Sequence, residues 1–267
     1  MEYVKTAIEK ARRERDKNSM AASEGDRQIP ARKAELQDSE AITIEYSQTR
    51  QQALDDQTLL QNRVVAAFEN DERSKPYRQL RTQILKKLRD NGWRTLAITS
   101  AQQNAGKTLT AVNLAIALAK EVNQTVLLAD MDFKGPNILD VLGLEAEIGL
   151  VQHLEGKAEL QDVLVNPGLD RLTILPALPV AGATSEILSS PRMKATLNEI
   201  VNRYSDRLVI FDLPPLLRDD DALVFTPYVD ATLLVIENGV TTPAEIERCY
   251  QLLEGTAIIG TVLNKAD

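Results

Sequence analysis

The stretch TLAITSAQQNAGKT, residues 95–108, joins a strand pattern to a helix pattern through a short loop that contains Gly-Lys-Thr. The apolar run Thr95–Thr99 predicts a buried β-strand, and an apolar helical pattern follows at Leu109–Val122. Strand, tight loop and helix in this order form a P-loop, in which backbone amides and the helix N-terminus face phosphate oxygens. The residues expected to bind the nucleotide here are Asn104, Ala105, Gly106, Lys107, Thr108 and Leu109.

Two side chains of the loop have an expected chemical role. Lys107 would neutralise the β- and γ-phosphates, and the Thr108 hydroxyl would ligate Mg²⁺. The loop departs from the G-x-x-x-x-G-K-[ST] pattern because Ala101 occupies the first glycine position. Asn104 stands where such loops often carry glycine, and asparagine tolerates a left-handed backbone better than most residues do. The sequence therefore predicts that the loop still folds around phosphate.

Carboxylates follow two further apolar runs, at the point where each run ends. Asp130 and Asp132 come after Thr125–Ala129, and Asp212 follows Leu208–Phe211. The carboxyl ends of parallel strands meet at one edge of a sheet, where open α/β folds bind ligands. Taken alone, the first two acids would fit solvated turn residues better. Together with the P-loop, the acids predict a magnesium–triphosphate site of oxygen ligands. The expected metal ligands are Thr108, Asp132 and Asp212.

The last apolar run, Ile258–Leu263, leads into Asn264-Lys265-Ala266-Asp267. We expect Asn264 to hydrogen-bond the nucleotide base. The same four residues match the N-K-x-D string of GTPases, in which the aspartate reads guanine. Because Asp267 is the final residue given and terminal residues are often poorly fixed, we favour adenine, and hence ATP, over guanine.

Short apolar runs rich in β-branched residues alternate with helical patterns over residues 59–267. Such alternation predicts a mostly parallel sheet covered by helices on both faces, and hence an α/β P-loop NTPase fold. The predicted strands are Thr95–Thr99, Thr125–Ala129, Leu172–Leu175, Leu208–Phe211, Ala231–Ile236 and Ile258–Leu263. The predicted helices are Leu59–Phe68, the segment from Pro76 to Gly92, Leu109–Val122, Met193–Tyr204 and Ala244–Leu253.

The first 58 residues form a separate predicted segment with a different composition. Residues 1–18 read as a charged helix, which is either solvated or a docking helix for a partner. Residues 19–40 have almost no large apolar side chains and are predicted to be a flexible linker. An edge strand is possible at Ile42–Tyr46. The predicted division is thus a helical and flexible extension, 1–58, and a P-loop domain, 59–267.

The bulk properties exclude several classes of protein. The net charge is −8, which argues against general nucleic-acid binding because that requires a basic face. No apolar stretch reaches the roughly 20 residues of a membrane span. A single cysteine, Cys249, permits no internal disulfide and fits a reducing compartment, so a cytoplasmic protein is expected. Its thiol is expected to be a structural helix residue.

The combined motifs resemble those of the bacterial tyrosine kinases of capsule and exopolysaccharide synthesis, of the CpsD/CapB and exosortase-associated type. The resemblance covers about residues 60–267. Besides the P-loop, it rests on PYRQLRT (76–82), ADMD (129–132), EILSSPRM (186–193), DLPP (212–215) and VLNK (262–265).

The resemblance implies an ATP-dependent protein-tyrosine autokinase on a MinD/ParA-like P-loop fold. It implies a Walker A pair at Lys107 and Thr108, a second acidic motif at Asp130 and Asp132, and a Walker B acid at Asp212. The catalytic residues implied are Lys107, Asp130, Asp132 and Asp212. It also implies a membrane-embedded chain-length or co-polymerase partner, which would hold the protein at the inner membrane, and a homo-oligomer.

Several positions depart from the family pattern. The Glu-x-x-Arg-x-x-Arg oligomerisation motif has Lys75 at its first position, followed by Arg78 and Arg81. Lys134 replaces the arginine that usually follows the second acidic motif, and lysine lacks its bidentate fork. The family's tyrosine cluster has no counterpart after Asn264, and most of the scattered tyrosines are expected to be structural. These tyrosines are Tyr3, Tyr46, Tyr77, Tyr204, Tyr228 and Tyr250.

Two alternatives to an active kinase remain open. One is a non-catalytic, ATP-sensing adaptor of a polysaccharide co-polymerase, which the departures above would permit. The other is a MinD/ParA-type positioning ATPase. That class carries a signature lysine five residues before the P-loop lysine, and this position is Gln102.

Overall fold

The computed structural model describes residues 50–182, 184–204 and 206–266, which build an eight-stranded sheet with the order β1-β4-β5-β3-β6-β2-β7-β8. Every pairing is parallel except that of β4 with β5. The predicted mostly parallel sheet is therefore confirmed. The strands are β1 (Arg50–Gln51), β2 (Thr95–Ser100), β3 (Thr125–Asp130), β4 (Val165–Asn166), β5 (Leu172–Leu175), β6 (Arg207–Asp212), β7 (Ala231–Glu237) and β8 (Ile258–Asn264).

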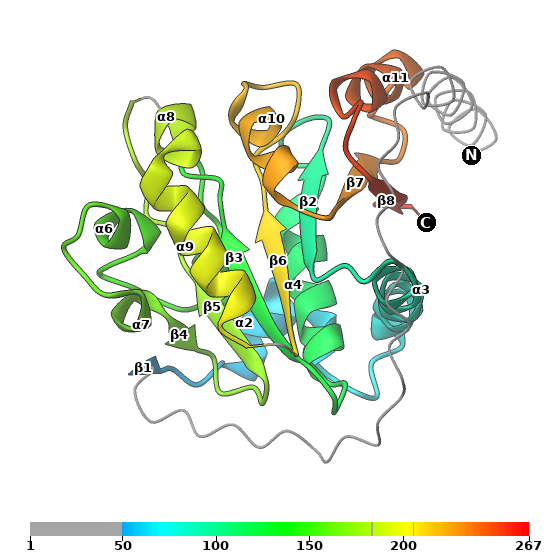
Figure 1. Cartoon of the computed structure of the whole chain (residues 1–267). Helices are drawn as coiled ribbons and strands as arrows, with labels where there is room; N and C mark the ends of the chain where they lie inside the picture. The colour runs from blue at the N-terminus through cyan, green and yellow to red at the C-terminus, as the bar shows by residue number, and fades with distance from the viewer. Residues whose placement is uncertain (1–49, 183, 205, 267) are drawn as a thin grey trace.

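Helices cover both faces of this sheet, with α9 on the near face and α4 on the far face in Figure 1. The α-helices are α2 (Asp56–Gln61), α3 (Lys75–Asn91), α4 (Lys107–Ala119), α5 (Ile138–Leu142), α6 (Leu150–Leu154), α7 (Leu160–Val163), α8 (Thr184–Ser189), α9 (Pro191–Asn202), α10 (Asp221–Phe225) and α11 (Pro243–Leu252). Three short 3-10 helices join them: η1 (Val65–Ala67), η2 (Glu72–Ser74) and η3 (Thr226–Tyr228).

The core is divided into two layers by the alternation of side chains along each strand. On β2, Ala97 packs into the layer under α6 to α11, whereas Leu96 and Ile98 pack into the layer under α2 to α5. The helix α4 is buried along nearly its whole length. Apolar residues at consecutive strand positions are thus explained by burial on both faces.

The sheet topology brings the predicted site strands together. In the strand order, β3, β6 and β2 are consecutive neighbours. Asp130 of β3 pairs in register with Asp212 of β6, and Asp212 pairs with Ile98 of β2. The two acidic strand ends and the P-loop therefore meet at one edge of the sheet.

The predicted helix Leu59–Phe68 is wrong as a single helix. The structure has α2, then a turn, then η1. Arg63 adopts a left-handed backbone with φ of 61°, which ends α2. The amide of Ala66 then donates to Asn113 Oδ1 of α4 at 2.9 Å, so a tertiary hydrogen bond replaces the helical one.

The other predicted helices and all six predicted strands are present, with ends that shift by a few residues. The predicted helix at 1–18, linker at 19–40 and strand at Ile42–Tyr46 lie outside the described residues. Residues 50–58 contribute β1 and the start of α2, and the domain division itself stays a prediction. Among the helices of the described residues, none combines the length and the apolar content needed to cross a bilayer.

Candidate functional site

The P-loop is built on two residues with a left-handed backbone. Asn104 has φ of 64° and Gly106 has φ of 90°, which confirms the expectation that asparagine would take the left-handed position. Ala101 is fully buried and is not among the described residues with positive φ. Because its backbone conformation suits any residue, alanine replaces the first glycine of the pattern without strain.

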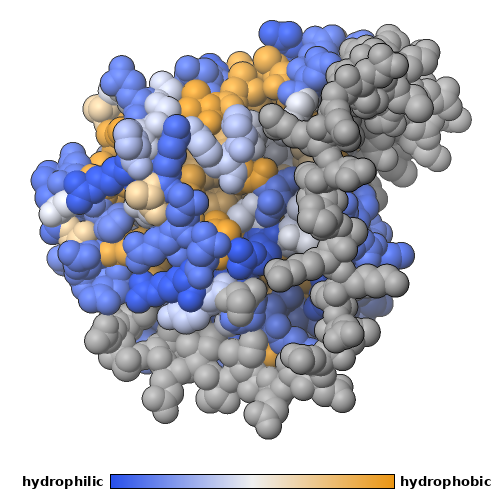
Figure 2. Space-filling view, viewed as in Figure 1, coloured by the Kyte–Doolittle hydropathy of each residue, from blue (hydrophilic) through white to orange (hydrophobic). Residues whose placement is uncertain are grey.

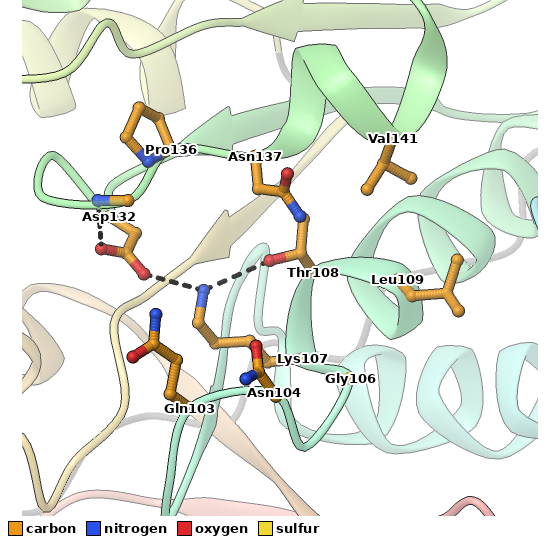
Figure 3. A pocket seen from close by; sticks show the side chains of 11 residues that line it. Gln103, Asn104, Gly106, Lys107, Thr108, Leu109, Asp132, Pro136, Asn137 and Val141 are labelled. Carbon is orange, nitrogen blue, oxygen red and sulfur yellow. Dashed lines mark hydrogen bonds and ion pairs between the residues drawn. The ribbon is translucent and has the colours of Figure 1, made fainter. Parts of the chain in front are cut away.

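Lys107 and Thr108 begin α4 and turn their polar groups toward the acidic strand ends. Lys107 Nζ lies 3.0 Å from Asp132 Oδ2 and 3.4 Å from Asp212 Oδ2. The Thr108 hydroxyl donates to Asp212 Oδ2 at 2.6 Å and lies 3.2 Å from Lys107 Nζ. Figure 3 shows Lys107 pointing between Asp132 and Thr108. The structure thus brings together the cation, the hydroxyl and two carboxylates that the sequence predicted as neighbours.

The three acids differ in what they face. Asp132 lines the pocket, and its Oδ1 accepts from the Gly135 amide at 3.1 Å. Asp212 is fully buried behind Lys107 and Thr108. Asp130 is only 1% exposed, and its two oxygens accept three backbone N–H groups, from Asp132, Asn137 and Ile138. Asp130 therefore shapes the loop that carries Asp132, and its direct role in catalysis stays a prediction.

Burial dominates the electrostatics of this cluster. It raises the pKa of Asp130 to about 7, with a further contribution from the charge of neighbouring Asp212. Burial also raises the pKa of Asp212, although Lys107 and the Thr108 hydroxyl act in the opposite direction. For Lys107, burial alone would lower the pKa, but Asp212, Asp132 and Asp130 outweigh it and raise the pKa. The ammonium of Lys107 thus partly neutralises a site that carries more carboxylates than cations.

The raised pKa of Asp130 predicts a pH-dependent stability. In the unfolded chain this carboxyl ionises near its usual pKa of 3.8, but in the folded protein only near 7. Between these values the unfolded state binds fewer protons, so stability falls as the pH rises, by about 1.4 kcal/mol per pH unit from this group. Urea unfolding of the nucleotide-free protein at pH 5, 6 and 7 should show this loss. Asp130→Asn should flatten the profile, and parallel profiles for the two proteins would contradict the assignment.

A pocket of about 480 Å³ opens between the P-loop and the segment after β3. Five of the predicted nucleotide-binding residues, Asn104, Gly106, Lys107, Thr108 and Leu109, line it. Asp132, a predicted metal ligand, also lines it. Sequence reasoning missed the remaining lining residues, although the turn-forming Gly-Pro-Asn at 135–137, shortly after the second acidic motif, was an available signal. These missed residues are Gln103, Gly135, Pro136, Asn137 and Val141.

Asn264 supports the loop from behind through a contact with Ala105. Asn264 Nδ2 donates to the Ala105 carbonyl oxygen at 2.8 Å, and this places the end of β8 against the P-loop. A Cβ on Gly106 would lie 2.0 Å from the same Nδ2, so only glycine fits there. Base recognition by Asn264 stays a prediction, since the observed contact of its amide is with the loop.

Gly106→Ala is expected to abolish nucleotide binding and to lower the melting temperature. The new methyl group would displace Asn264, and alanine would also pay the left-handed penalty of about 1–2 kcal/mol. Gly255→Ala is the matched control, because Gly255 has φ of 87° against 90° for Gly106 but has no neighbour within 4 Å of the added carbon. Both variants should lose some stability in thermal unfolding, but only Gly106→Ala should lose ADP binding. Equal effects would show that the Asn264 contact is unimportant.

The remaining residues noted in the sequence have structural contacts. Cys249 is fully buried in α11, and burial raises the pKa of its thiol to about 12, as expected for a structural cysteine. Lys134 Nζ lies 2.8 Å from Asp219 Oδ2 and 3.2 Å from Asp221 Oδ2. These ion pairs connect the loop after β3 to the loop after β6 and to the start of α10. Gln102 Nε2 contacts Glu245 Oε1 of α11.

Comparison with known proteins identifies the family of the chain. The family model for the CobQ/CobB/MinD/ParA nucleotide binding domain matches residues 96–267. Tyrosine-protein kinase YwqD of Bacillus subtilis is 31% identical over 208 residues, which cover 77% of this chain and 86% of YwqD. The succinoglycan biosynthesis transport protein ExoP of Rhizobium meliloti is 32% identical over 183 residues, 65% of this chain and 22% of ExoP. The kinase domain of the Escherichia coli tyrosine kinase ETK superposes with a TM-score of 0.69 at 30% identity, covering 76% of this chain and 82% of that domain.

The fold and the P-loop pocket define a P-loop nucleotide-binding protein. The chain belongs to the CobQ/CobB/MinD/ParA nucleotide-binding family and, within it, to the bacterial tyrosine-protein kinases of capsule and exopolysaccharide biosynthesis.

Proposed function

We propose that the chain is an ATP-dependent protein-tyrosine kinase that regulates exopolysaccharide or capsule biosynthesis. The observation that carries the proposal is the convergence of Lys107, Thr108 and Asp132 at one pocket, with Asp212 buried behind the first two. Kinship with YwqD and with the ETK kinase domain supports tyrosine as the acceptor. A transferase of this kind needs little covalent help from its side chains, because positioning and charge neutralisation supply most of the catalysis.

The donor set of the pocket fits Mg²⁺ bound to ATP. The Thr108 hydroxyl and the carboxylates of Asp132 and Asp212 offer hard oxygen ligands, and we assign the metal to them. When bound, magnesium would neutralise charge on the β- and γ-phosphates. Lys107 would bind the same phosphates, and the amides of the P-loop would hold their oxygens.

We assign to Asp132 the role of orienting an acceptor hydroxyl, because it lines the pocket. The phenolic oxygen of the acceptor would attack the γ-phosphorus as the bond from that phosphorus to the bridging oxygen breaks. ADP would then leave, and the phenolic proton would pass to a carboxylate or to water. Lys107 would stabilise the charge that develops on the phosphate oxygens.

An apolar surface at the carboxyl edge of the sheet offers a contact area for a protein acceptor. Figure 2 shows hydrophobic surface over α8 and α10 at the carboxyl edge of the sheet. Exposed or partly exposed apolar residues of this region are Ile187, Leu217, Leu223 and Val224. We extend the proposal to a membrane-embedded co-polymerase partner and to a homo-oligomer, on the basis of the family.

Intact mass spectrometry of the purified protein after incubation with ATP and Mg²⁺ tests the kinase proposal. A mass gain of one or more phosphates that tyrosine phosphatase removes would support it. ATP binding without a mass gain, also when a tyrosine-rich acceptor peptide is supplied, would favour the ATP-sensing adaptor. ADP release without any phosphotyrosine would favour a positioning ATPase, although Gln102, at the signature-lysine position of that class, contacts Glu245 of its own chain.

A further inference from the structure

A second cavity lies at the far end of α4, away from the nucleotide pocket. It is formed between α3, the last turn of α4 and residues 66–74, and its volume of about 480 Å³ equals that of the P-loop pocket. The helix α4 has 13 residues and begins at Lys107, so it separates the two cavities by roughly 20 Å at about 1.5 Å per residue. In Figure 1, α3 lies on one side of the molecule and α4 passes behind the sheet beside it.

Three cations face this cavity: Arg78, Arg81 and Lys120. The sequence pattern suggested subunit contacts for the two arginines, and this stays a prediction; in the structure both line the cavity. The three charged groups gather at one place because two turns of α3 face the C-terminal end of α4. Among the described residues, Glu69 is the only carboxylate that lines the cavity.

The contacts of these cations hold them in place mainly through neutral groups. Arg78 Nη1 donates to the Glu69 carbonyl oxygen at 3.1 Å and to Ser74 Oγ at 2.5 Å. Lys120 Nζ donates to the Ala67 carbonyl oxygen at 3.2 Å. Within the described residues, neither Arg78 nor Lys120 has a carboxylate oxygen within 4.0 Å, so each retains N–H donors that could bind an anion.

Arg81 is the one member of the trio with an ion pair. Its Nε lies 3.2 Å from Glu121 Oε1, and its Nη1 donates to the Ala117 carbonyl oxygen at 3.4 Å. Burial lowers the pKa of Lys120, and the positive charges of Arg78 and Arg81 lower it further, against an opposing effect of Glu69. A bound anion would relieve this repulsion, whereas a neutral ligand would leave it unchanged and a cation would increase it.

We propose that this cavity is a binding site for a phosphomonoester, distinct from the nucleotide site. Guanidinium groups and an ammonium are the donors that bind phosphate oxygens in proteins. The cavity is also larger than a lone phosphate requires, and Ala66, Phe68 and Ala117 add apolar lining beside the cations. An aromatic phosphomonoester such as phosphotyrosine therefore fits its chemistry, with the phosphate on the cations and the ring against the apolar side.

Calorimetric titration with O-phosphotyrosine and with inorganic phosphate tests the site, and unphosphorylated tyrosine serves as the ligand control. Arg78→Ala should weaken binding at least tenfold, as expected for loss of a charge-assisted contact. Arg89→Ala removes the same charge from an exposed position of α3 and should leave binding unchanged. Tighter binding of phosphotyrosine than of phosphate would identify the aromatic ester as the ligand, and equal binding would identify free phosphate.

The P-loop also attracts phosphate, so Lys107→Met is titrated in parallel. The Arg78-sensitive binding should persist in Lys107→Met, and ADP titration reports separately on the nucleotide site, so the two proposals can fail independently. Binding that is lost in Lys107→Met but unchanged in Arg78→Ala would overturn the second site. The second site would also be overturned if Arg78→Ala lost self-association in light scattering but bound phosphate and phosphotyrosine as the unaltered protein does. If Arg78→Ala does not fold, Lys120→Gln decides by the same criteria.

Discussion

Lys107→Met is expected to lower phosphotransfer by at least about 100-fold, the size of effect seen when a single group that stabilises transition-state charge is removed. Methionine matches the length of the lysine stem but removes the ammonium that lies 3.0 Å from Asp132 and 3.4 Å from Asp212. The phosphates then lose their principal cation. ADP affinity should fall by about 10- to 100-fold, which corresponds to the 1.5–3 kcal/mol of a hydrogen bond to a charged group.

The same substitution should also change the apo protein in a way that separates electrostatics from misfolding. Without the ammonium, three buried acids share one region with no compensating charge. Lys107→Met should therefore lose stability at pH 8 and regain it toward pH 5, because the pKa of Asp130 is raised to about 7 and this acid is protonated there. Lys86→Met, at an exposed position of α3, is the control and should change neither property. Unchanged ADP affinity in Lys107→Met would refute the site.

Much of the fold could be predicted because strands that are buried on both faces appear in the sequence as continuous apolar runs. The β3 segment is buried at all six of its positions, and its apolar run was readable as a strand. The segment at 59–68 could not be predicted in the same way. Its helical periodicity is real, but the left-handed turn at Arg63 and the hydrogen bond from Ala66 to Asn113 depend on packing against a helix about 50 residues away in the chain.

The site was predictable to the extent that its residues sit at strand and helix ends. Lys107, Thr108, Asp132 and Asp212 converge as expected, since the sheet order alone brings their strands together. The environment of Asp130 was not predictable, because it depends on three backbone amides that come from a loop two to eight residues later. Likewise, the contact of Asn264 with the Ala105 carbonyl requires the three-dimensional position of β8.

Asp212→Asn is expected to reduce phosphotransfer by at least about 100-fold while it leaves the fold intact. Asparagine keeps the shape of the side chain and can still accept from the Thr108 hydroxyl, which donates to this position at 2.6 Å. It loses the negative charge that would hold the metal and that lies beside Lys107. Because burial already raises the pKa of Asp212, the neutral amide costs little in folding, and the variant should be at least as stable as the unaltered protein at pH 8.

The combination of intact stability and lost activity separates a metal-binding role from a structural one. ADP affinity should become nearly independent of Mg²⁺ in Asp212→Asn, whereas in Lys107→Met it should fall with and without the metal. Asp90→Asn, on the exposed face of α3, is the control for the loss of one carboxylate. A different result would be that Asp212→Asn is less stable, while its folded fraction still binds ADP in a Mg²⁺-dependent way. In that case the carboxylate stabilises the strand end, and the metal must be assigned to other oxygens. If it folds and keeps full activity, the charge of Asp212 has no part in phosphotransfer, and the proposed site loses the acid that joins β6 to the P-loop.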